Sequence, residues 1–268
     1  MKEFLGKWTW VSKIFLALLA VGVWAVPAAH AAKPTADVSV SVLSQYIWRG
    51  EADSRDSMVI QPSYTFGYDG AFVNIWQNID TNPYLDAMDN LNETDFTFGY
   101  SKDIGPVTVE GGYIWYALSG EKDMNELYVS GTLNTMLSPK LTVYREISHY
   151  PSTYITLGVS QSVPVGQVMG RDLDLNLAAK VSYLASNDKG AYWDGNNKSK
   201  DFNDFKDGLI SASMDFPLAK NVTLTPEIDW TFPLSKKAGE LLSDSSFDAG
   251  RSGQNSFVYG GITVDVQF

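Results

Sequence analysis

The sequence contains no cysteine. This absence excludes disulfides, thiolate metal sites and a lipid-anchored cysteine behind a leader peptide. After the N-terminal region there is also no run approaching the roughly 20 apolar residues that a membrane-spanning helix needs, which excludes a helical membrane protein. Basic residues are few, 20 against 31 acidic ones, so the formal net charge is −11. This charge argues against nucleic acid or an anionic surface as a partner.

Residues 1–31 have the features of a secretory signal peptide. Three lysines stand at or before position 13, the apolar stretch Ile14–Val26 follows, and Ala29-His30-Ala31 is a small-residue cleavage site. The apolar stretch is too short to span a bilayer as a helix. We expect cleavage after Ala31, which leaves residues 32–268 as a single domain outside the cytoplasm.

The rest of the chain alternates apolar and polar residues, the pattern of β-strands with one apolar and one polar face. The final stretch, Ser256–Phe268, has apolar or small residues at every second position from Val258 and ends on an aromatic residue. This ending resembles the closing strand of bacterial outer-membrane β-barrels, which their assembly machinery recognises. The same stretch would also suit the last strand of a soluble sandwich, so the rest of the chain has to decide.

Two alternating stretches are joined by Asp69-Gly70, the signature of a two-residue β-hairpin. This turn pairs Tyr68 with Ala71 and, further along, Thr65 with Asn74. The apolar residues of both stretches then share one face, so the two alternations agree through the turn.

About twelve stretches carry the alternation, each near the ~10 residues that a tilted membrane strand requires. Short turns and longer polar loops follow one another along most of the chain, as in a barrel with a periplasmic and an extracellular rim. A soluble sandwich has no reason for that order. The sequence therefore predicts an all-β fold, a transmembrane antiparallel up-and-down β-barrel, with no helix after the leader. The predicted strands cover residues 38–48, 60–68, 71–78, 94–102, 107–117, 125–134, 140–148, 153–163, 173–185, 209–216, 222–232 and 256–268.

If the apolar faces contact lipid, the polar faces line the lumen. Twelve strands lie between the eight that side chains fill and the sixteen that leave a wide channel. Lumen carboxylates favour cations, and aromatic faces beside them can stack on a sugar or nucleoside. Alternatively, these residues hydrogen-bond to each other across a plugged interior. The predicted pore-lining residues are Glu110, Glu126, Glu146, Asp174, Asp215, Glu227, Asp229, Asp265 and Lys180, with Trp76, Tyr128, Tyr144 and Tyr259 as aromatic contacts.

His149 is the only histidine after the leader, and it stands at the predicted extracellular end of a strand. Outer-membrane lipid hydrolases place a histidine near that rim, so a rim hydrolase is an alternative reading. Such an enzyme needs a hydroxyl within hydrogen-bond reach of the imidazole. The adjacent Ser148 would point to the opposite face of the strand. A solvated rim residue is the better interpretation.

Three further features concern the rims. The loops 81–95 and 186–206 are rich in Asp and Asn, which can bind calcium but also form ordinary loops. Arg145 alternates with apolar neighbours and would face lipid, unless the register shifts or the residue lies near the rim. Aromatic residues near strand ends on the apolar faces are expected to anchor in the membrane interface. They are Trp48, Trp115, Tyr183 and Trp230.

The segment from Ser44 through Tyr46, Trp48 and Arg49-Gly50, followed by the Asp69-Gly70 hairpin, resembles a known family. It is similar to an uncharacterised proteobacterial family of predicted outer-membrane β-barrels, the Gcw_chp-like proteins, which open with a Ser-x-x-Tyr-x-x-Arg-Gly strand. The resemblance implies a porin-like fold and an outer-membrane location. It implies no activity and no catalytic residues.

From the residues and this resemblance we expect a passive, cation-preferring channel for small solutes of sugar or nucleoside size. A closed structural or surface-binding barrel remains the main alternative. We expect no enzymatic activity, cofactor or resident metal. The expected partners are outer-membrane lipid, a small-molecule solute and, through Phe268, the barrel-assembly machinery; the sequence specifies no oligomeric state. A lumen network joining Arg49 to Asp80 or Glu51 is a further hypothesis.

Overall fold

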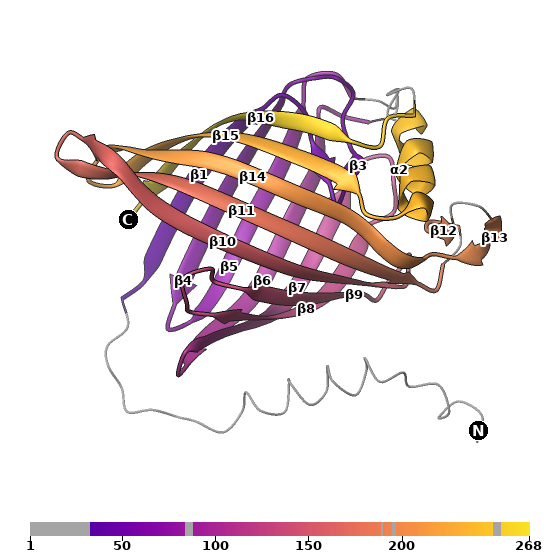
Figure 1. The fold of residues 1–268 in the computed structure, drawn as a ribbon, viewed down its shortest axis with the longest axis horizontal. Coiled ribbons are helices and arrows are strands. Elements are labelled where there is room, and N and C mark those ends of the chain that lie inside the picture. Colours follow the sequence, from indigo (N-terminus) through magenta and orange to yellow (C-terminus); the bar gives the residue numbers. More distant parts are fainter. Residues whose placement is uncertain (1–32, 84–87, 189, 195–196, 249–252) are drawn as a thin grey trace. The chain divides into compact units, whose positions relative to one another are not determined.

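Twelve antiparallel strands close into a barrel in the computed structural model (Figure 1). Around the ring they follow the order β1-β16-β15-β14-β11-β10-β9-β8-β7-β6-β5-β4, so nearly every strand pairs with its neighbours in the sequence. This is the predicted up-and-down barrel, and its strand number is confirmed. The strands are β1 (Thr35–Leu43), β4 (Val59–Tyr68), β5 (Ala71–Asp80), β6 (Leu91–Ile104), β7 (Val107–Leu118), β8 (Met124–Leu133), β9 (Lys140–Glu146), β10 (Ser152–Val168), β11 (Arg171–Ser186), β14 (Asn203–Ala219), β15 (Val222–Pro233) and β16 (Phe257–Gln267).

The structure describes residues 33–83, 88–188, 190–194, 197–248 and 253–268. The predicted leader, residues 1–31, lies outside them. Within the described residues, no helix has the length and apolar character needed to cross a membrane. The elements outside the barrel wall are the hairpin of β2 (Ile47–Trp48) and β3 (Glu51–Ala52), the hairpin of β12 (Trp193–Asp194) and β13 (Asn197–Asp201), and the helix α2 (Lys236–Asp248).

The β4–β5 hairpin has the predicted register. Tyr68 pairs with Ala71, and Thr65 pairs with Asn74. Asp69 and Gly70 both have positive φ, 51° and 83°, as a two-residue turn matched to the strand twist requires. A non-glycine residue at that φ is uncommon, and Asp is among the residues that tolerate it.

The ring closes between the first and last strands. Val40 of β1 pairs with Val264 of β16. Phe268, which follows β16, exchanges backbone hydrogen bonds with Ala36 near the start of β1. Both ends of the described barrel therefore lie at the rim with the short turns. The long connections, which include α2 and the β12–β13 hairpin, lie at the opposite rim (Figure 1).

Apolar side chains point outward from the wall along each strand. Ile228 on β15 is 57% exposed, whereas its neighbours face the other way, with Glu227 half-buried and Asp229 buried. The same alternation holds for Val264 beside Asp265 on β16. An apolar outer face with polar residues on the inner face is typical of a barrel surrounded by lipid.

The first strand is shorter than predicted. β1 ends at Leu43, and residues 44–58 turn inward and carry the β2–β3 hairpin. Tyr46 is buried against Trp76 of β5, with ring centroids 5.4 Å apart, and Trp48 contacts Tyr116 of β7. The expectation that Trp48 anchors in the membrane interface is therefore wrong. The apolar–polar alternation continues through this inward-folding loop, because its aromatic residues are buried inside the barrel. The pattern therefore predicted a longer strand.

The helix α2 was not expected from the sequence. It lies in the connection between β15 and β16, which was predicted to be a loop. Ser235 caps its start, because the Ala238 backbone N–H donates to the Ser235 hydroxyl at 3.1 Å. Ala238, Leu241 and Leu242 are buried along one face. Their spacing of three and four residues is the pattern of an amphipathic helix, and it is hard to recognise in the sequence because the surrounding residues are polar.

Arg145 keeps the register that aims it outward, opposite Leu127 and Thr153. It is the next-to-last residue of β9, so it lies near the rim rather than at mid-membrane. Its guanidinium donates to the Thr153 hydroxyl at 3.0 Å. The conflict in the sequence is removed by this position near the rim.

Candidate functional site

The β2–β3 hairpin crosses the lumen. It follows β1, yet its tip residue Arg49 reaches β8, β9 and β10, and β9 is diametrically opposite β1 in the ring. Arg49 donates from both terminal nitrogens to the two carboxylate oxygens of Glu126, at 2.8 and 2.6 Å. This two-pronged pairing of guanidinium with carboxylate is the strongest geometry available to an ion pair.

Aromatic rings surround the Arg49 guanidinium. Its central carbon lies 4.7 Å from the ring centre of Tyr144 and 4.4 Å from that of Tyr154, with Trp48 at 4.3 Å. These distances are within the range of cation–π attraction. We call Glu126, Tyr144 and Tyr154 the cation cage.

The predicted network of Arg49 with Asp80 or Glu51 is not what the structure shows. Asp80 is buried at the end of β5, where it accepts hydrogen bonds from the Ser57 hydroxyl and the Asn82 backbone, each at 2.8 Å. Glu51 pairs instead with Lys206 of β14. The hairpin tip directs Arg49 across the lumen, so its carboxylate partner is Glu126 of β8 rather than Glu51 or Asp80.

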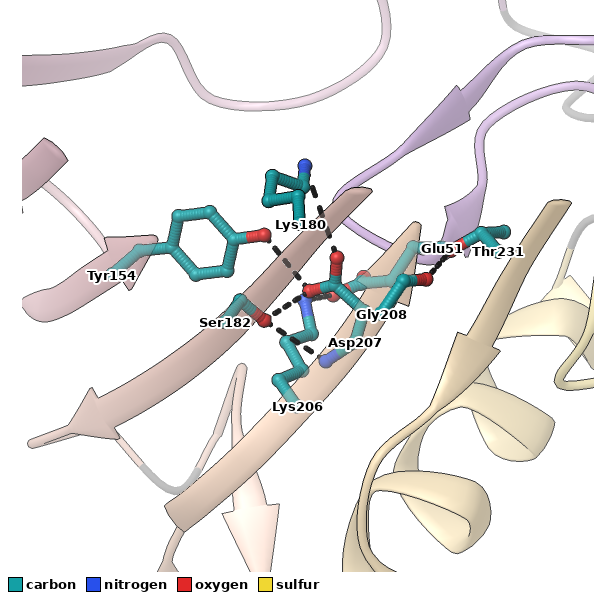
Figure 2. A network of polar contacts seen from close by, with 8 residues as sticks. All are labelled: Glu51, Tyr154, Lys180, Ser182, Lys206, Asp207, Gly208 and Thr231. Carbon is teal, nitrogen blue, oxygen red and sulfur yellow. Dashed lines mark hydrogen bonds and ion pairs between the residues drawn. The ribbon is translucent and has the colours of Figure 1, made fainter. Parts of the chain in front are cut away.

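A second network lies on the wall beside the cage (Figure 2). Asp207 of β14 is 1% exposed, and its carboxylate accepts hydrogen bonds from the Tyr154 hydroxyl at 2.8 Å and the Ser182 hydroxyl at 2.6 Å. Lys180 of β11 lies 4.0 Å away. Since Tyr154 belongs to both networks, the cage and the Asp207 cluster are linked through one side chain.

Lys206 and Asp207 were missed by the sequence reasoning. The loop before the predicted strand extended to Lys206, whereas β14 starts at Asn203. In the sequence, charged residues at the start of a strand look like part of a loop, and only the structure shows that these two side chains are buried inside the barrel. Lys206 is 1% exposed and pairs with Glu51, so it fastens the second side of the hairpin.

Hydrophobic packing adds to these polar contacts at the long-loop end of the barrel. Leu184 of β11, Phe202 and Leu241 of α2 are buried together with Tyr154 in one cluster. Elsewhere at this end, Ala52 of β3 packs with Phe257 of β16 in a second cluster. The β2–β3 hairpin and α2 therefore form a plug at the long-loop end of the lumen. We use that name for residues 44–58 and α2 together.

The predicted lumen carboxylates lie at different heights along the barrel axis. Glu126 and Glu146 lie near the long-loop ends of their strands, and Glu227 and Asp229 lie midway along β15. The remaining ones lie near the short turns. They are Glu110 of β7, Asp174 of β11, Asp215 of β14 and Asp265 of β16.

Several of these carboxylates have polar neighbours and remain partly accessible. Asp215 accepts hydrogen bonds from Asn176 and Thr225, each at 2.8 Å, and pairs across strands with Asp174. Glu110 accepts a hydrogen bond from the Tyr128 hydroxyl at 3.0 Å. The short-turn half of the lumen thus has an acidic wall below the plug.

Glu146 has a structural task. Its carboxylate accepts hydrogen bonds from the backbone N–H groups of Ser148, His149 and Tyr150 at 2.9–3.0 Å, and from the Ser148 hydroxyl. His149 is exposed, and its Nδ1 lies 2.8 Å from the Asp123 carbonyl oxygen. Glu146 therefore shapes the turn after β9, and Ser148 serves that turn rather than the imidazole.

The predicted aromatic contacts face the lumen and pack there. Tyr128 and Tyr144 stack with ring centres 5.8 Å apart, and Tyr144 continues to Tyr154 at 6.1 Å. Trp76 contacts Tyr46 of the plug, and Tyr259 packs against the cluster of Ala52 and Phe257. These rings serve as the surface on which the plug rests.

The acidic loops contribute no metal cluster within the part of the chain that the structure describes. Parts of both loops, residues 84–87, 189 and 195–196, lie outside that part. Asp194 of the second loop pairs with Lys237 of α2 at 2.9 Å. In the described residues, this loop is thus tied to the plug.

Asp53, in the plug just after β3, predicts a pH effect. Burial, and then the negative charges of Glu51 and Glu93, raise the pKa of this carboxyl well above 3.8. A group whose pKa is higher in the folded than in the unfolded state contributes stability at a pH below its unfolded-state pKa. This contribution is lost as the pH rises through the folded-state pKa. We expect Asp53→Asn to raise the melting temperature at mildly alkaline pH and to have less effect in acid.

The measurement is the temperature at which the folded barrel loses its faster-migrating band in gel electrophoresis, determined at several pH values from about 4 to about 8. Asp69→Asn, in the turn at the other rim, is the matched control. Equal effects of Asp53→Asn at all pH values would contradict the prediction.

The closed ring, the outward apolar faces and the polar lumen define a porin-like β-barrel of the outer-membrane type. The chain belongs to a bacterial family of proteins of unknown function, Gcw_chp, whose family model matches residues 28–245. The family resemblance read from the sequence is thereby confirmed. No match was found among curated proteins.

Among solved structures, the NanC porin shares this fold. The chain is 10% identical to the NanC porin, with 87% of this chain and 98% of that chain covered and a TM-score of 0.52. It is 11% identical to the KdgM porin, with the same coverages and a TM-score of 0.49. Identity this low makes the likeness to NanC one of fold.

Proposed function

We propose that this protein is a passive outer-membrane channel for small neutral or cationic solutes. The observation that carries the proposal is the acidic wall of the lumen, which includes Glu227 and Asp229 midway and Asp215 and Asp265 near the short turns. Carboxylates around a narrow lumen attract cations and repel anions. The shared fold with the NanC porin supports the channel class.

The proposed location follows from the barrel and from the predicted leader. Cleavage after Ala31 delivers the chain to the periplasm, and the assembly machinery recognises the strand that ends at Phe268. The apolar outer face then contacts outer-membrane lipid. The short-turn rim faces the periplasm in this arrangement, and the plug faces outward.

The test is the reversal potential of the refolded barrel in a planar bilayer with a salt gradient. We expect steady, cation-selective steps. In the double variant Glu227→Gln/Asp229→Asn the reversal potential should move toward zero, because two lumen charges are removed while the wall keeps its shape. The control is Asp69→Asn/Glu240→Gln, which removes two charges from a turn and from α2. Unchanged selectivity in the lumen variant would contradict the assignment.

A closed barrel is the second candidate, and the plug favours it. Two ion pairs and the cluster of Ala52 and Phe257 hold the β2–β3 hairpin across the long-loop end, and the cluster around Tyr154 holds α2 there. A correctly folded barrel that stays silent in the bilayer would support this candidate against the channel. The rim hydrolase has no comparable support, since Ser148 donates to Glu146 and His149 contacts a backbone carbonyl.

A further inference from the structure

The cation cage is built by the wall alone. Glu126, Tyr144 and Tyr154 belong to β8, β9 and β10, which are adjacent in the ring. The Tyr116 hydroxyl from β7 donates to Glu126 Oε2 at 2.8 Å and helps to fix the carboxylate. The receptor for a planar cation therefore exists independently of the hairpin that fills it.

The occupant of the cage is a side chain on a loop. Arg49 stands at the tip of a hairpin of two very short strands. Its backbone φ is 50°, in the left-handed region that non-glycine residues adopt less often. Gly50 follows at 85°. The same pair of angles occurs at Asp69-Gly70, so the values belong to a two-residue hairpin turn that places Arg49 at its tip.

The cage has the chemistry of guanidinium recognition. A carboxylate takes two parallel N–H donors from a planar fork, and aromatic faces stack on its plane. Glu126 is 2% exposed, so its negative charge is desolvated and requires a cation. An ammonium group lacks both the fork and the flat face.

We propose that Glu126, Tyr144 and Tyr154 form a binding site for the guanidinium group of a small solute, which enters by displacing Arg49. The inference rests on the proposed channel function, because the solute reaches the site through the lumen. Arg49 acts as a tethered competitor. Exchange of the tethered guanidinium for a free one releases one side of the plug, while Lys206 still holds Glu51 on the other.

The binding test uses methylguanidinium as the probe. Arg49→Ala empties the cage, and calorimetric titration of the variant in detergent micelles should show saturable binding. The wild-type barrel should bind at least about tenfold more weakly, because the tethered side chain competes at a high effective concentration. N-methylurea, a neutral planar isostere, and tetramethylammonium, a non-planar cation, are the ligand controls.

Two variants keep the outcome decisive. Arg49→Ala/Glu126→Gln should lose the binding seen with Arg49→Ala. If Arg49→Ala does not fold, Arg49→Lys replaces it, and it should bind methylguanidinium more tightly than wild type because lysine lacks the planar fork. No binding in a folded Arg49 variant, or equal binding of N-methylurea, would overturn the proposal.

This assay is separable from the channel test. A barrel that conducts cations but whose Arg49→Ala variant binds no methylguanidinium refutes the cage and leaves the channel intact. A variant that binds methylguanidinium in a barrel that never conducts refutes the channel and leaves the cage as a ligand site.

Discussion

Replacement of Arg49 by alanine is expected to lower the free energy of unfolding by about 3–5 kcal/mol, because removal of one partner leaves a buried charge uncompensated. The charge left behind is the Glu126 carboxylate, which is 2% exposed and, among the described residues, keeps the Tyr116 hydroxyl as its hydrogen-bond donor. Urea unfolding in lipid vesicles, followed by tryptophan fluorescence, measures the loss. In the bilayer, the same variant should give larger steps, because one fastening of the plug is gone.

The control for this prediction is a second substitution. Arg49→Ala/Glu126→Gln should recover most of the lost stability, since a neutral amide needs no cation. Lys237→Ala, which breaks the exposed pair with Asp194, should change little. A loss for Arg49→Ala no larger than that for Lys237→Ala would show that the pair does not hold the plug.

Gly261→Ala is expected to prevent closure of the barrel. Gly261 lies on β16, between Leu43 of β1 and Glu227 of β15. A Cβ atom there would overlap the Val42 carbonyl oxygen and approach the Leu43 Cα to 2.9 Å. Overpacking usually costs about 1–3 kcal/mol, and here backbone rather than a flexible side chain would have to move. The expected result is loss of the compact, heat-modifiable species on refolding.

Gly131→Ala is the matched control on β8. It is also a strand glycine, yet the nearest heavy atom to its Cβ would be Val107 Cγ1, 3.9 Å away. This variant should refold as the wild type does. Similar refolding yields of the two variants would contradict the steric argument. They would show that the backbone between β1 and β16 can shift more easily than the structure indicates.

The plug changes which lumen residues can contact a passing solute. In an open barrel, Glu126 and Tyr144 would contact passing solute, as the sequence predicts. In the structure they hold Arg49, and the accessible carboxylates lie below them, with Asp215 and Asp265 near the short turns. Conductance through this barrel would therefore depend on the ion pairs of the hairpin as well as on lumen charge.

The wall of this protein is readable in the sequence. A period of two assigns each strand residue to one of two faces, and a two-residue turn sets the register of its hairpin without distant information. That is why Tyr68 and Ala71 pair as predicted, and why Glu227, Asp229 and Asp265 fall on the inner face beside exposed apolar neighbours. Strand number and topology follow from the same local pattern, whereas the family was recognised from the motif around Arg49-Gly50.

The plug was decided by the tertiary structure alone. Arg49 meets Glu126, 77 positions away, and Glu51 meets Lys206, 155 positions away, because closure of the ring brings β8 and β14 within reach of one loop. Alternation cannot tell an inward-folding loop from a continuing strand, as Tyr46 and Trp48 show. Local periodicity therefore specifies the barrel wall, whereas the partners inside it depend on closure of the whole ring.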